Sequence, residues 1–266
     1  LEPESAIDNI PVVVRLSGSL DLDALRSAVR DVIARHEVLR TSYPDTDGVG
    51  SQRIHTTDQI EIDTSPREVA ASTVSEHIAA TIDAPFDLQS AVPLRVRLFR
   101  LGNDEHILVL VTHHIAADGF SMTPLARDVM VAYSARAEGT APPWAPLPVQ
   151  YADYTLWQQE VLGSPEDPTS PAAKQEKYWS ETLAGLPDQL DLPSDRPRPL
   201  SGSGAGGSVT VEIGSVIHDR IAQVARARQA TPFMVVHTAL AVVLARATGN
   251  TDIAVGTPTA GRGDAA

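Results

Sequence analysis

The stretch at residues 107–121 reads Ile-Leu-Val-Leu-Val-Thr-His-His-Ile-Ala-Ala-Asp-Gly-Phe-Ser. Its apolar run at 107–111 has the length and composition of a buried strand. The residues that follow, 122–130, read Met-Thr-Pro-Leu-Ala-Arg-Asp-Val-Met and predict a helix. A polar cluster therefore stands where a core strand ends and a helix begins. Unpaired polar groups are costly in such a place, so the cluster needs a reason.

His113 and His114 suggest a chemical reason, because a neutral imidazole can accept a proton near pH 7. The start of the following helix carries partial positive charge, which disfavours imidazolium. Asp118 follows His114 by four residues, and Gly119 permits a close approach of backbone or substrate. The same residues also fit histidines packed in the core and satisfied by backbone. A metal site is disfavoured, because adjacent side chains on an extended strand point in opposite directions.

Residues 113–119 resemble the His-His-x-x-x-Asp-Gly motif of condensation domains of nonribosomal peptide synthetases, in the chloramphenicol-acetyltransferase-like superfamily. Residues 35–43, Arg-His-Glu-Val-Leu-Arg-Thr-Ser-Tyr, are similar to the family's second motif. Residues 151–157 resemble the fourth motif, and residues 255–262 resemble the opening of the fifth. The four matches follow the family's order. The first motif and the end of the fifth are absent, so we expect a fragment that is incomplete at both ends.

The resemblance implies a role for each residue of the motif. His114 is expected to face the cleft and to be catalytic, where it orients an amine or removes its proton. His113 is expected to support the site from the core side. Gly119 and Ser121 are expected to shape the site, with backbone N–H groups available to an oxyanion.

Asp118 is implied to be structural and to pair with an arginine. A buried carboxylate without a cation would be expensive, so the pairing is physically reasonable. Arg35 and Arg40 in the second motif are candidates for the partner, and Arg262 is a further candidate. The sequence does not choose among them.

The composition excludes several classes of protein. The chain has 266 residues, no cysteine and a net charge of −13. It therefore has no disulfide framework, no cysteine nucleophile and no cysteine-ligated zinc, which fits a reducing, cytoplasmic location. The negative charge argues against nucleic acid and against anionic membrane surfaces. We find no stretch long enough for a membrane span.

The rest of the chain predicts an α+β fold. By resemblance, residues 1–170 form a chloramphenicol-acetyltransferase-like lobe, a mixed sheet with flanking helices. Residues 171–207 form a connecting helix and a Pro- and Gly-rich linker, and residues 208–266 form the truncated start of a second, similar lobe. Hydrophobic patterns predict helices at 21–36, 66–83, 119–138, 151–162, 172–186, 216–229 and from 231, and strands at 10–16, 38–43, 52–55, 60–62, 94–101, 106–112, 209–213 and 252–256.

The resemblance also implies a reaction. Donor and acceptor carrier protein domains would present thioesters on 4′-phosphopantetheine, and the chain would join them through an amide bond. We expect an adjacent adenylation domain and no cofactor bound by the domain itself. Residues 115–128 and 147–157 look like the subtype that takes a D-configured donor and an L-configured acceptor. Two alternatives remain open: an epimerization domain, and a non-catalytic platform that recruits partners.

Overall fold

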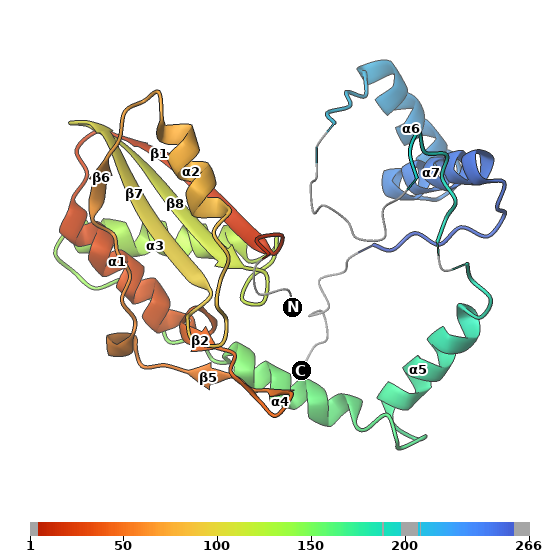
Figure 1. The fold of residues 1–266 in the computed structure, drawn as a ribbon, viewed down its shortest axis with the longest axis horizontal. Coiled ribbons are helices and arrows are strands. Elements are labelled where there is room, and N and C mark those ends of the chain that lie inside the picture. The colour runs from red at the N-terminus through yellow and green to blue at the C-terminus, as the bar shows by residue number, and fades with distance from the viewer. Residues whose placement is uncertain (1–4, 188, 198–206, 208, 258–266) are drawn as a thin grey trace. The chain divides into compact units, whose positions relative to one another are not determined.

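The computed structural model describes residues 5–187, 189–197, 207 and 209–257 (Figure 1). The chain divides into two compact units, Leu1–Ser164 and Pro165–Ala266. Most of the predicted Gly-rich linker at 201–207 lies outside the described residues. The elements in chain order are β1 Asn9–Ser17, α1 Leu22–Arg35, η1 Glu37–Arg40, β2 Thr41–Ser42, β3 Asp45–Thr46, β4 Val49–Gly50, β5 Arg53–Ile54, η2 Thr57–Gln59, β6 Pro66–Glu68, α2 Val74–Ile82, β7 Leu94–Gly102, β8 Glu105–His113, α3 Met122–Ala137, α4 Tyr151–Leu162, α5 Pro171–Thr182, α6 Ser215–Ala227 and α7 Pro232–Thr248.

The first unit is built on a four-stranded mixed sheet with the order β1-β8-β7-β6. β8 lies between β1 and β7 and is antiparallel to both, whereas β6 is parallel to β7. The β7–β8 hairpin confirms the two neighbouring strands that the apolar runs predicted. The predicted α+β class, with a mixed sheet and flanking helices, is confirmed.

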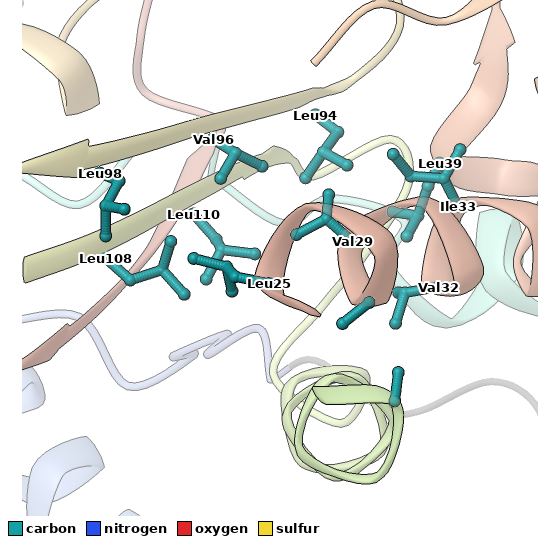
Figure 2. Packing of buried hydrophobic residues seen from close by; sticks show 12 residues of the cluster. Leu25, Val29, Val32, Ile33, Leu39, Leu94, Val96, Leu98, Leu108 and Leu110 are labelled. Atoms are coloured by element: carbon teal, nitrogen blue, oxygen red, sulfur yellow. The ribbon is translucent and has the colours of Figure 1, made fainter. Parts of the chain in front are cut away.

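Side chains that alternate along β7 and β8 divide the core between the two faces of the sheet. On one face, Leu94, Val96 and Leu98 pack with Leu108 and Leu110 against α1 (Figure 2). α3 lies on the same face and contributes Ala132 to this cluster. Odd-numbered residues of the same strands face α2 and the loop after it, where they form a second cluster.

Helix α1 shows why the sequence folds as it does locally. The side chain of Asp21 accepts a hydrogen bond from the backbone N–H of Ala24 at 2.9 Å, which caps the helix at the predicted position. Leu25, Val29 and Val32 recur at helical spacing and are buried on one face.

Three predicted elements of the first unit are wrong. Residues 60–62, which were predicted to form a strand, belong to no helix or strand. Residues 38–43 form no continuous strand, because the 3₁₀ turn η1 occupies 37–40 and only Thr41 and Ser42 pair with β5. The helix predicted from Pro66 begins instead at Val74, since residues 66–68 form β6 beside β7. Proline lacks an N–H and is tolerated as the first residue of an edge strand.

The second unit consists of three helices among its described residues. Ser170 and Thr231 cap α5 and α7 with their side chains, and a proline follows each cap. Strands predicted at 209–213 and 252–256 are not assigned, because no described segment pairs with either. Val209 is 89% exposed, as expected for an extended segment outside a sheet.

Within the described residues, no individual helix has the length and apolar composition to cross a membrane. Helices α6 and α7, which are bent by 104° relative to each other, meet that length and composition only as a pair.

Candidate functional site

The end of β8 fixes where the two histidines point. The backbone N–H of His113 donates to the carbonyl of Pro93 at 3.1 Å, and that of His114 donates to the carbonyl of Asp8 at 2.8 Å. Pro93 precedes β7 and Asp8 precedes β1, so segments leading into both neighbouring strands hold this end. The N–H of Ala116 then donates to the carbonyl of His113 at 2.9 Å and closes a tight turn.

His113 is buried, with 6% of its surface exposed. Its Nδ1 accepts a hydrogen bond from the backbone N–H of Ile115 at 3.0 Å, which places the ring proton on Nε2. The ring meets Phe86 edge-on, with centroids 6.1 Å apart and planes at 87°. Burial lowers the pKa of His113, and the carboxylate of Asp8 opposes this only in part. The ring is therefore neutral near pH 7.

His114 is exposed. It follows the last residue of β8 and stands inside the turn that His113 and Ala116 close. The structure thus buries one histidine and exposes the other. This matches the opposite directions that strand alternation predicted, and the roles of the two side chains stay predictions.

Asp118 and Ser121 hold each other at the start of α3. Oδ1 of Asp118 accepts from the hydroxyl of Ser121 at 2.6 Å and from its backbone N–H at 2.9 Å. The Ser121 hydroxyl in turn accepts from the backbone N–H of Asp118 at 3.1 Å. Gly119, between them, has no described heavy atom within 4 Å of where a Cβ would stand. The loop is ordered by its own side chains and leaves open space at the glycine.

The arginines of the second motif have other partners than Asp118. Nε of Arg35 donates to Oδ2 of Asp128 at 2.9 Å, and Arg40 donates to Oε1 of Glu37 at 3.0 Å. Arg262, the third candidate partner of Asp118, lies outside the described residues.

Asp128 is a buried carboxylate that was not among the predicted site residues. It lies on α3, it is 3% exposed, and it also bonds Nε2 of His36 at 2.8 Å. Burial acts to raise the pKa of Asp128, but the hydrogen bonds from His36 and Arg35 outweigh it and lower the pKa. Arg127, the preceding residue, donates to Oδ1 at 3.3 Å, but Arg35 and His36, which bind Oδ2, are more than 90 residues away in sequence and leave no local signal.

A cavity of about 920 Å³ opens beside the motif within the first unit. Its wall combines the approach to β1, the β3–β5 region, the loop after α2 and one side of α4. The lining includes Asp8, Tyr43, Phe86, His113, Ile115 and Tyr151. Burial raises the pKa of Tyr43 to about 12, and Tyr151 adds to the rise, so the Tyr43 hydroxyl is a neutral hydrogen-bond donor in the cavity wall.

Among the residues that the structure describes, no three His, Cys, Asp or Glu side chains gather in a way that could hold a metal ion.

Comparison with known proteins gives the family. The profile of the condensation domain family matches residues 1–266. The dimodular nonribosomal peptide synthase of Bacillus subtilis (strain 168) is 46% identical over 264 residues, which are 99% of this chain and 11% of that protein. The chain therefore spans about a tenth of the length of this relative.

Two solved structures share the fold. The X-domain in its complex with OxyB from teicoplanin biosynthesis is 36% identical with a TM-score of 0.86, over 92% of this chain and 53% of that chain. A four-domain nonribosomal peptide synthetase bound to AMP and glycine is 23% identical with a TM-score of 0.82, over 99% of this chain and 20% of that chain. The fold is the chloramphenicol-acetyltransferase-like fold that the motifs suggested, and this chain belongs to the condensation domain family of nonribosomal peptide synthetases.

Proposed function

We propose that this chain joins two acyl groups through an amide bond, both of which arrive as thioesters on carrier protein domains. The amine of the acceptor attacks the donor thioester carbonyl. A C–N bond forms, the C–S bond breaks, and the proton lost by the amine balances the thiolate that leaves. An amine is already a fair nucleophile, so holding it in line with the carbonyl supplies much of the acceleration.

The observation that carries this proposal is the placement of His114. Its imidazole is exposed at the end of a strand whose last residues are bonded to Pro93 and Asp8. Because these bonds fix the backbone that carries it, the imidazole projects from a defined position, from which it can orient an amine or accept its proton. His113 holds the turn from the buried side, and the Asp118–Ser121 pair orders the loop that follows.

The proposed partners are a donor and an acceptor carrier domain, with an adenylation domain adjacent in the same protein. The acyl groups would be attached as thioesters to the 4′-phosphopantetheine arms of the carriers, and the domain would bind no cofactor of its own. Residues 115–128 and 147–157 support a preference for a D-configured donor.

The test uses the full-length protein with loaded carrier domains and mass spectrometry of what each carrier holds. Amide formation predicts the joined product on the acceptor carrier and an unloaded donor carrier. An epimerization domain would instead return the same acyl group with mixed configuration at its α-carbon. Either that result or two unchanged carriers would contradict the proposal.

A non-catalytic recruitment platform is the second candidate. It is favoured by the likeness to an X-domain that was solved in a complex with OxyB. Under this alternative the carriers stay unchanged, while a partner protein is bound with an affinity that does not depend on His114.

A further inference from the structure

Two arginines, Arg95 and Arg97, stand on the face of β7 that is covered by α2, and their surroundings differ. Nη1 of Arg95 donates to the carbonyls of Thr81 and Ala84 at 3.0 and 2.9 Å, and Nη2 donates to that of Pro85 at 2.8 Å. These carbonyls belong to the last turn of α2 and the segment just after it. Arg95 therefore fastens the end of this helix to the sheet.

The guanidinium of Arg95 is linked to His113 of the motif by contacts with one aromatic ring, that of Phe86. Its central carbon lies 4.3 Å from the ring centroid of Phe86, within the range of a cation–π contact. Phe86 in turn meets His113 edge-on, with centroids 6.1 Å apart. Arg95, Phe86 and His113 thus form a continuous chain of contacts on one face of the sheet.

His113 ends this chain by fixing the turn that carries His114. Its Nδ1 accepts from the N–H of Ile115, and its carbonyl accepts from the N–H of Ala116. The first of these bonds depends on the ring orientation, because Nδ1 must point at the N–H of Ile115. Phe86 borders the ring and limits its rotation.

We infer that Arg95 is a positioning residue for the condensation motif: it holds Phe86 against His113 and thereby sets the turn that presents His114. Neither Arg95 nor Phe86 belongs to the motif at 113–119. The inference rests on the proposed function, in which His114 acts on the amine. Burial lowers the pKa of His113 and keeps Nδ1 able to accept.

The chain provides a matched control in Arg97, which lies two residues along the same face of β7. Its guanidinium donates to the carbonyl of its own neighbour, Val96, at 2.8 Å. Replacing Arg97 by methionine removes the same charge from the same face and leaves the contact with Phe86 in place. Arg95→Met removes the carbonyl bonds and the cation–π contact together, and Arg95→Lys keeps the charge.

The first readout is the tautomer of His113, from ¹⁵N–¹H correlation of its ring nitrogens in the 266-residue chain. We expect a single Nε2–H form in the wild type and in Arg97→Met. Arg95→Met is expected to give a mixture of tautomers, and Arg95→Lys an intermediate result. Phe86→Leu, which leaves Arg95 intact, should reproduce the mixture. An unchanged Nε2–H form in both Arg95→Met and Phe86→Leu would overturn the inference.

The second readout is condensation by the full-length protein. Arg95→Met is expected to lower kcat by on the order of ten- to a hundredfold, with KM within about twofold of the wild type, because misplacement of a catalytic group acts on the chemical step. If His113 changes tautomer in Arg95→Met while His114→Ala keeps the full rate, the proposed function is contradicted and the positioning role of Arg95 is supported. If His114→Ala is inactive while Arg95→Met keeps the wild-type tautomer of His113 and the wild-type kcat, the positioning role of Arg95 is contradicted and the proposed function is not.

Discussion

Asp128 is the carboxylate whose replacement should cost the first unit most. Its side chain is 5% exposed. Its Oδ2 pairs with Nε of Arg35 and Nε2 of His36, whose side chains are 12% and 22% exposed. Removing one partner of a buried ion pair costs about 3–5 kcal/mol, because the other charge is left without compensation. In Asp128→Asn, Arg35 keeps its hydrogen bond to the carbonyl of Ala145 and its contact with the ring of Trp144. We therefore expect a loss at the lower end, about 3 kcal/mol.

For a unit of this size, such a loss corresponds to a fall in Tm of roughly 6–12 °C, which thermal unfolding followed by circular dichroism can measure at pH 7. Asp23→Asn is the matched control, because Asp23 is 88% exposed in its pair with Arg26 and surface pairs contribute little. The pKa of Asp128 is lowered in the folded state, so its contribution is present above its ordinary pKa of about 3.9 and is lost as the pH falls through the lowered value. A loss below about 1 kcal/mol at pH 7, or a Tm equal to that of Asp23→Asn, would show that Asp128 contributes no more than a surface carboxylate.

Three further predictions address the core, the buried histidine and the substrate. Leu98→Ala should lower the free energy of unfolding by about 2–5 kcal/mol in urea titrations, because Leu98 is 0% exposed, and a loss under about 1 kcal/mol would contradict the packing. The lowered pKa of His113 means that the folded state binds fewer protons, so stability should fall as the pH drops below about 6.5, whereas His113→Gln should show a flatter profile between pH 5 and 7; equal slopes would exclude this origin. Donors that end in a D-residue should condense faster than their L-counterparts in single-turnover assays, and a preference for the L-donor would reject the subtype.

The elements that were predicted correctly carry their signals locally. Helix α4 begins at Tyr151 and ends at Leu162, which are the predicted bounds. The β7–β8 hairpin follows from two apolar runs on either side of a short polar turn. Cap residues and hydrophobic period are properties of neighbouring residues, and a single sequence contains them.

The elements that were missed depend on distant partners. β6 exists because residues 66–68 pair with β7, about 30 residues further along, and the residues near Pro66 do not indicate that pairing. The run at 209–213 has strand composition, yet a strand requires a neighbour, and no described segment supplies one.

The site also contains features that could be predicted from local sequence and features that could not. Alternation along β8 predicted that one histidine would be buried and the other exposed, and burial places His113 inside and His114 outside. Arg35 and His36 lie more than 90 residues from Asp128, and the contacts that join Arg95 to His113 through Phe86 link separate segments of the chain. Periodicity and motif spacing contain no information about such contacts.

The rate of amide formation by His114→Ala measures the contribution of the His114 imidazole to the reaction. The measurement is a single turnover in the full-length protein with both carriers loaded, with His218→Ala as the control, because His218 is an exposed histidine on α6 with a side chain 75% accessible. We predict that His114→Ala loses at least about a hundredfold in rate, in the range typical for a general acid–base group, while its Tm and the control's rate stay at the wild-type values. A folded His114→Ala protein that forms the amide at the wild-type rate would show that His114 takes no part in the reaction.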